Sequence, residues 1–137
     1  MSVLIEKLGQ ELSREIIQTS HAPAAVGPYS QAIKAAPFVF VSGQLGLDQN
    51  SGSLVDGLEA QTRQVLENLK SILRESGSDL TNVVKTTIFL TNMADFSAVN
   101  AIYAEAFSDA PPARSTVEVA SLPLGGLIEI EAIALIG

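Results

Sequence analysis

Apolar and polar positions alternate most clearly between residues 113 and 136, where the pattern predicts two strands. In the first strand Arg114, Thr116 and Glu118 share one side, because successive side chains alternate across a pleated sheet. In the second strand every other residue is apolar, which gives a continuous face of Ile128, Ile130, Ala132, Ala134 and Ile136. The opposite face changes character along its length, in the order Glu129, Glu131, Ile133 and Leu135. A solvated face stays polar throughout, so we expect part of this one to be covered.

The charges on these two strands admit two interpretations. In the first interpretation, Glu129 and Glu131 are solvent-facing charges that protect an apolar strand from aggregation, and Arg114 is their salt-bridge partner across the sheet. In the second interpretation, these residues belong to a protected site. The residues alone favour the first interpretation, since charged strand residues are usually solvated. The second interpretation places Glu129 at the edge of the site.

The rest of the chain predicts a hairpin, a further strand and two helices. The hairpin strands cover residues 30–34 and 38–42, with 35–37 as the turn, and a β-branched run predicts another strand over 83–91.

Both predicted helices carry one apolar face. The first covers residues 58–76, where Leu69 and Leu73 lie among the apolar positions, and the second begins with Asp95 as its N-cap and reaches about Phe107. The order is β-β-α-β-α-β-β, an α+β fold in which two helices cover one face of a sheet. Self-association is the simplest way to cover the other face.

The amino-acid composition excludes several kinds of site and partner. The 137 residues suit one domain, and 47% hydrophobic with 17% charged residues is a globular composition. The chain has no cysteine and one histidine, His21, which excludes a thiol nucleophile, a thiolate metal site and a His-pair metal site; we therefore expect no metal. A net charge of −7 without a basic cluster makes nucleic acid an unsuitable partner.

We expect a cytoplasmic protein and leave an organellar location open. No apolar run approaches the roughly 20 residues that span a bilayer, so no membrane association is expected. The segment from Met1 to Glu15 lacks a signal-peptide core, and we expect the mature chain to start near Met1. Leu4, Leu8 and Leu12 recur every fourth residue, which predicts either a short amphipathic helix on the body or a frayed tail.

Four blocks of the chain, in the right order and spacing, resemble the RidA (YjgF) family. They are TSHAPAAVGPYSQAI, FVFVSGQLGLD, VVKTTIFLTNMADFSAVNAIYAEAF and PPARSTVEVASLPLGGLIEIEAIA. The resemblance covers residues 17–137, and residues 1–16 form an N-terminal extension outside it. It implies a chorismate-mutase-like protomer in a homotrimer with a barrel-like core and sites in the clefts between subunits.

The resemblance also implies a chemistry that needs no cofactor: hydrolysis of 2-aminoacrylate, 2-iminopropanoate or 2-iminobutanoate to a 2-keto acid and ammonia. Arg114 matches the family arginine that holds the substrate carboxylate, and a guanidinium suits that task because its planar fork pairs with both oxygens. Glu129 matches the carboxylate that positions or activates the attacking water. The other matches to residues lining the family's cleft are Tyr29, Ser42, Gly43, Asn100 and Thr116.

Two of these matches keep a second interpretation, and a third departs from a frequent family pattern. Tyr29 is also consistent with a core ring whose hydroxyl is satisfied, and Asn100 with an amide on a helix surface. Thr116 stands where many family members have cysteine, but the family binds ligand there through the backbone, so threonine keeps deamination plausible. A non-catalytic trimer that binds small carboxylates remains an alternative function, and a ribonuclease or translation inhibitor is a weaker one.

Overall fold

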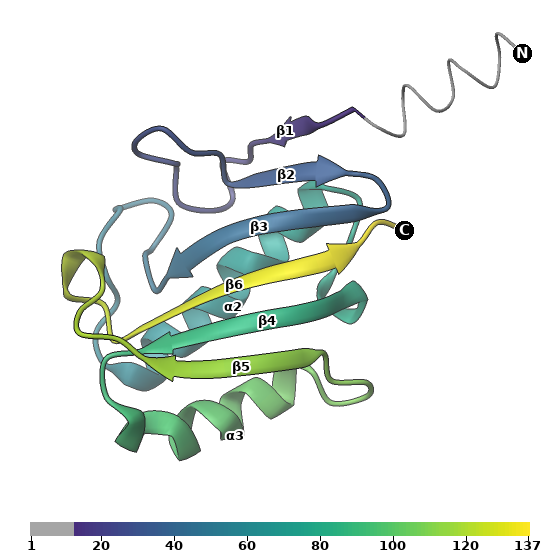
Figure 1. Ribbon diagram of the computed structural model, residues 1–137. Coiled ribbons are helices and arrows are strands. Elements are labelled where there is room, and N and C mark those ends of the chain that lie inside the picture. Colours follow the sequence, from purple (N-terminus) through teal and green to yellow (C-terminus); the bar gives the residue numbers. More distant parts are fainter. Residues whose placement is uncertain (1–12) are drawn as a thin grey trace, which may run out of the picture.

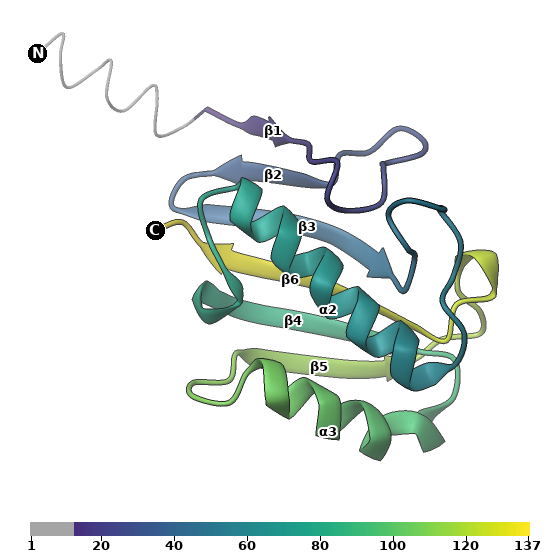
Figure 2. The same cartoon turned by 180° about the vertical axis from the view of Figure 1, so that it is seen from behind.

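Six strands form one mixed sheet, and two helices lie together on one of its faces (Figures 1 and 2). The structure is a computed structural model, which describes residues 13–137. The predicted α+β fold, with both helices on the same face, is confirmed. The helix predicted around Leu4, Leu8 and Leu12 lies outside the described residues.

The strands are β1 Glu15–Ile17, β2 Ala32–Ala35, β3 Phe38–Leu45, β4 Val83–Leu90, β5 Ala113–Glu118 and β6 Ile128–Leu135. The helices are α2 Leu58–Glu75 and α3 Phe96–Ala106. Short 3-10 turns occupy Leu80–Asn82, Met93–Asp95 and Pro123–Gly125. The order matches the predicted one with a single addition, the three-residue strand β1, which pairs with β2.

The C-terminal strand lies in the middle of the sheet. The strand order is β1-β2-β3-β6-β4-β5, so β6 separates the hairpin β2–β3 from β4. All pairs are antiparallel except β4 with β5. Parallel neighbours need a crossover connection, and α3 supplies it between these two strands. As a result α3 lies along β5 at the edge of the sheet, and α2 lies over β3 and β6.

The core lies between the sheet and α2. The apolar stripe of α2 buries Val65, Leu69, Ile72 and Leu73 completely. Opposite it lies the apolar face predicted for β6, of which Ile128, Ile130, Ala132 and Ala134 are buried. Residues at every second position of a strand and every third or fourth of a helix meet here, which is why the two periods define one core.

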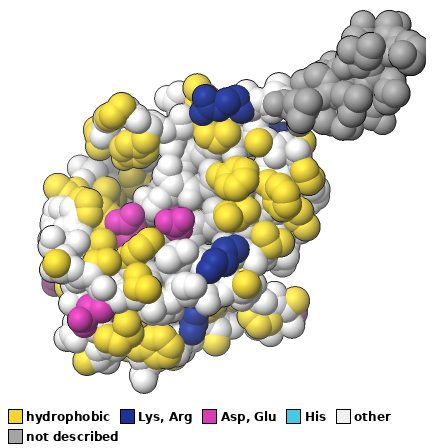
Figure 3. Space-filling view, in the orientation of Figure 1, with side chains coloured by type: hydrophobic (Ala, Val, Ile, Leu, Met, Phe, Trp, Pro, Cys, Tyr) yellow, Lys and Arg dark blue, Asp and Glu magenta, His cyan; other side chains and the backbone are white. Residues whose placement is uncertain are grey.

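The second face of the sheet carries no helix, and we call it the open face. In the space-filling view it shows two adjacent acidic side chains surrounded by apolar ones (Figure 3). Large apolar side chains exposed on it include Phe38, Phe40 and Leu135, at 38%, 44% and 41% of their surface. An apolar surface of this kind, made from separate strands, is typical of a protein interface.

Two local predictions are wrong in detail. The strand predicted to end at Ser42 continues to Leu45 as β3, with a register shift against β6 between Val41 and Gln44. Asp95 occupies the N-cap position of α3 as predicted, but its side chain makes no capping hydrogen bond; the Asn92 side chain accepts from the Ala94 N–H and caps the 3-10 turn that precedes α3. Asn and Asp are near-equivalent caps, so sequence alone did not separate the two positions.

Across residues 13–137, neither helix combines the length and the apolar character needed to cross a membrane.

Candidate functional site

Arg114 lies on the helix-covered face, under α3. Its strand partner is Thr86 of β4, which is fully buried, and the Arg114 side chain is half-buried. One terminal guanidinium nitrogen donates a 2.8 Å hydrogen bond to Oδ1 of Asn100. Among residues 13–137 no carboxylate forms an ion pair with Arg114. The cation therefore retains N–H groups for a ligand, since a guanidinium has five.

Two aromatic rings lie against the same guanidinium. Its central carbon lies 5.4 Å from the centroid of the Phe96 ring and 4.9 Å from that of Tyr103. Phe96, Asn100 and Tyr103 are spaced i, i+4, i+7, which places them on one stripe of α3. All three therefore meet Arg114 from the same side.

Thr116 and Glu118 follow Arg114 on the same face of β5. The carboxylate of Glu118 accepts a 2.7 Å hydrogen bond from the Met93 N–H, which ties β5 to the start of α3. Thr116 Oγ1 is buried and has no hydrogen-bond partner within residues 13–137. A buried hydroxyl without a partner is costly, so a donor or acceptor from outside this chain would be favourable here.

Glu129 lies on the open face, half-buried near the start of β6. Its cross-strand neighbours are Leu45 of β3 and Phe89 of β4. Burial raises the pKa of the Glu129 carboxyl, and the nearby negative charge of Glu131 raises it further. A carboxyl with a raised pKa exchanges protons more readily near neutral pH, as a general acid or base must. Glu131, the next residue on this face, is exposed.

Gly43 makes room for the Glu129 carboxylate. A Cβ added at Gly43 would clash with Oε1 of Glu129 and would lie 2.8 Å from its Cδ. The carboxylate thus rests on the main chain of β3 at the register shift between Val41 and Gln44. The glycine at this position is explained by this contact.

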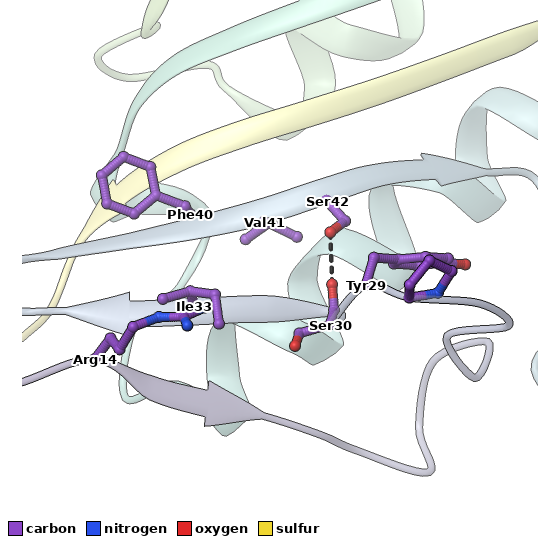
Figure 4. Close-up of a pocket in the computed structure, with 8 residues that line it drawn as sticks. Arg14, Tyr29, Ser30, Ile33, Phe40, Val41 and Ser42 are labelled. Atoms are coloured by element: carbon purple, nitrogen blue, oxygen red, sulfur yellow. Dashed lines mark hydrogen bonds between the residues drawn. The ribbon is translucent and has the colours of Figure 1, made fainter.

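Ser42, the residue before Gly43 in β3, and Tyr29 line a hollow of about 460 Å³ (Figure 4). The Ser42 hydroxyl donates a 2.6 Å hydrogen bond to the carbonyl of Ser30, which fixes its position. The Tyr29 ring is 51% exposed, and its hydroxyl accepts a 3.3 Å hydrogen bond from the Val26 N–H. The interpretation of Tyr29 as a core ring is therefore wrong.

The expected site residues fall into two groups. The cation group, on the helix-covered face, consists of Arg114, Asn100 and Thr116. The carboxylate group, on the opposite side of the sheet, consists of Glu129, Gly43, Ser42 and Tyr29. No salt bridge joins Arg114 to Glu129 or Glu131 within residues 13–137, so the cross-sheet ion pair considered above is wrong. The interpretation of Asn100 as a surface amide is wrong too, since it binds Arg114.

Sequence reasoning missed the role of the two rings. The apolar positions of the helix that follows Asp95 include Phe96 and Tyr103, which predicts that both rings are buried, but this pattern gives no reason to connect them with Arg114. The shared i, i+4, i+7 stripe with Asn100 was the available signal. The described residues contain no cluster of three or more His, Cys, Asp or Glu side chains that would hold a metal ion.

The sequence profile of the family described as endoribonuclease L-PSP matches residues 19–136. The chain therefore belongs to this family, which is also known as the RidA or YjgF family.

Similarity to individual proteins supports the same family assignment. The chain is 55% identical to the chloroplastic Reactive Intermediate Deaminase A of Arabidopsis thaliana over 124 residues, which are 90% of this chain and 66% of that protein. It is 50% identical to the 2-iminobutanoate/2-iminopropanoate deaminase of Capra hircus over 92% of this chain and 93% of that protein. Among solved structures, RidA from an Antarctic Psychrobacter superposes with a TM-score of 0.87 at 47% identity, covering 89% of this chain and 99% of that one.

Proposed function

We propose that this protein is a hydrolytic deaminase that converts 2-imino acids and their enamine tautomers to 2-keto acids and ammonia. The substrates are 2-aminoacrylate, 2-iminopropanoate and 2-iminobutanoate. The observation that carries the proposal is the identity of about 50% over nine-tenths of the chain to proteins named 2-iminobutanoate/2-iminopropanoate deaminase. The groups present around Arg114 and Glu129 suit this chemistry.

The reaction needs a carboxylate anchor, one water and one group that moves a proton. Arg114 pairs with the substrate carboxylate through N–H groups that Asn100 leaves free. Glu129 takes a proton from water as the water oxygen bonds to the C=N carbon. The same carboxyl gives that proton to nitrogen, which yields a carbinolamine. Glu129 then moves the hydroxyl proton to nitrogen as well, the C–N bond breaks as the keto C=O forms, and ammonia leaves. No electrons are exchanged with an outside group, so this sequence of steps requires no cofactor.

The remaining residues of the two groups shape the cleft. Gly43 lets the main chain of β3 lie against the Glu129 side chain, and Ser42 and Tyr29 line a hollow together. Thr116 offers backbone groups next to Arg114 and a hydroxyl that has no partner among the described residues. Glu131 contributes charge to the environment of Glu129 and has a structural or interface role.

The protein acts as a homotrimer with each site between two subunits. One protomer cannot place its own Arg114 and Glu129 on one small ligand, because they lie on opposite faces of the sheet. The exposed apolar side chains of the open face supply a surface for a neighbouring copy. Sedimentation at micromolar concentration is expected to give three times the mass of the chain, and a monomer would contradict the assembly.

A coupled assay tests the activity. A threonine dehydratase generates 2-iminobutanoate, and ammonia release is timed with and without this protein. Acceleration is expected, and its absence would contradict the enzyme proposal. If 2-ketobutyrate binds while no imine is hydrolysed, the alternative of a non-catalytic carboxylate-binding trimer gains support.

The family's name motivates one further control. The matched profile is described as an endoribonuclease, whereas the net charge of −7 opposes binding to a phosphate backbone. We expect no salt-sensitive RNA binding or cleavage, and either result would revive the ribonuclease alternative.

We assign the deaminase activity to a RidA-like domain of residues 17–137, and residues 1–16 form an N-terminal extension to this domain. The proposed location is the cytoplasm, and the chloroplastic relative keeps an organellar location open.

A further inference from the structure

The guanidinium of Arg114 is held by two aromatic rings. The distances to Phe96 and Tyr103, 5.4 and 4.9 Å, lie within the roughly 6 Å over which a cation is attracted to a ring face. A ring face attracts the cation without using any of its N–H groups. Contacts of this kind restrain the guanidinium and leave its donors available.

The Tyr103 side chain is held in place by contacts with Thr86 of β4 and with Phe107. Its hydroxyl shares a 2.6 Å hydrogen bond with the hydroxyl of Thr86, which is fully buried in β4. The ring of Phe107 packs 4.5 Å from the Tyr103 ring, centroid to centroid. Burial raises the pKa of the Tyr103 hydroxyl, so this side chain stays neutral at physiological pH. The ring beside Arg114 therefore has little freedom to move.

Asn100 also restrains the guanidinium of Arg114. It accepts one N–H of the guanidinium at 2.8 Å, which fixes the rotation of the group between the two rings. A cleft of about 640 Å³ opens beside Arg114, between α3 and residues 108–112. An arginine side chain loses rotamer entropy when it is fixed, and here most of that loss precedes ligand binding.

We propose that Phe96 and Tyr103 are positioning residues, whose rings hold the Arg114 guanidinium so that its free N–H groups meet the carboxylate of a 2-imino acid. The inference rests on the proposed function for the identity of the ligand. Neither ring touches the reacting C=N bond. Their loss therefore weakens carboxylate binding and leaves proton transfer at Glu129 intact.

The test compares variants by two measurements, titration with 2-ketobutyrate and imine hydrolysis. Tyr103→Leu removes the ring, and we expect 2-ketobutyrate affinity to fall about 3- to 30-fold, the range for loss of a cation–π contact, with KM raised more than kcat is lowered. Phe96→Leu is expected to act in the same direction. Tyr103→Phe keeps the ring but leaves the Thr86 hydroxyl unpaired, so it should lower the melting temperature while affinity stays within about 2-fold.

Phe107→Leu is the matched control, because it removes a buried ring just after the end of α3 that packs on Tyr103, while both rings on Arg114 remain. Its affinity for 2-ketobutyrate is expected to stay within about 2-fold of the parent protein. If Tyr103→Leu fails to fold, the affinity of Phe96→Leu for 2-ketobutyrate tests the inference instead. Phe96 is only half-buried, so its replacement should disturb the fold less.

Unchanged affinity in the folded ring variants would overturn the inference, as would equal losses in Phe107→Leu. Absence of 2-ketobutyrate binding to the parent protein would overturn it too. If the parent binds 2-ketobutyrate, the ring variants lose that binding and no imine is hydrolysed, the inference stands while the proposed enzymatic function fails.

Discussion

Arg114 and Glu129 lie on opposite faces of the sheet, separated by one strand. Arg114 pairs with Thr86 of β4, and Glu129 pairs with Phe89, three residues further along the same strand. Thr86 and Phe89 point to opposite faces because their spacing is odd. With strands about 4.8 Å apart, β5 and β6 are separated by roughly 10 Å across β4. A three-carbon imino acid therefore cannot contact both groups of one protomer.

Mixing two inactive variants tests the shared site directly. We expect Arg114→Ala and Glu129→Gln to be inactive alone and to recover activity when denatured together and refolded as mixed trimers. Each cleft then takes its arginine from one copy and its carboxylate from the next, so random assembly at equal amounts restores about a quarter of the parent activity. No recovery in verified mixed trimers would place both residues in the same protomer's site.

Arg114→Lys keeps the charge and loses the planar fork. Lysine cannot pair with both carboxylate oxygens at once, because its ammonium lacks the planar fork of donors. We expect affinity for 2-ketobutyrate and kcat/KM in the imine assay to fall by at least about 10-fold. The melting temperature and the trimer should be unaffected. Unchanged catalysis would remove Arg114 from the site.

Glu129→Gln keeps the side-chain shape and removes the ability to accept a proton. Hydrolysis is expected to fall about 10²- to 10⁴-fold, while 2-ketobutyrate binds about as well as before. Glu131→Gln is the matched control, two residues along the same face, and should change the rate by less than about 10-fold. Full activity of Glu129→Gln would show that Glu129 is only a charged residue on the surface of the strand.

Protonation of Glu129 also links stability to pH. Its pKa is raised in the folded state, so the folded protein binds more protons than the unfolded chain between the two pKa values. The free energy of unfolding should therefore fall as the pH rises from below the ordinary carboxyl pKa to above the raised one. Glu129→Gln should lack this loss and melt at a higher temperature than the parent at pH 7, with the difference shrinking near pH 4. A constant difference across that range would argue against the raised pKa.

Gly43→Ala should separate the position of Glu129 from its chemistry. The added methyl group occupies the space of the Glu129 carboxylate, which is the mobile end of a side chain and can move away at little cost. We expect stability within about 1 kcal/mol of the parent and a loss of at least about 10-fold in kcat. Gly46→Ala offers a contrast, because its Cβ would lie 2.6 Å from the Cα of Gln61 in α2 and should mainly destabilise the fold. Full activity of Gly43→Ala would show that the carboxylate position is not critical.

Several features of this protein are determined by the sequence itself. The periodicity of α2 and the alternation of β6 predict their buried faces correctly, because each element repeats with its own period and buries one side. The resemblance to the RidA family predicts the fold class that the structure confirms. The predicted faces of β5 and β6 are also correct, residue by residue, for Arg114 and Glu129.

Only the tertiary structure decided how those faces relate to one another. Local periodicity says which residues share a side, but not which side the helices cover or that β6 inserts between β3 and β4. Those features depend on pairings between residues far apart in the chain, such as Val41 with Ala132. The enclosure of Arg114 by Phe96 and Tyr103 follows from the same crossover, because α3 lies over β5 only once β4 and β5 run parallel. The sequence thus determined the groups that carry the chemistry, and long-range packing determined that they lie on opposite faces.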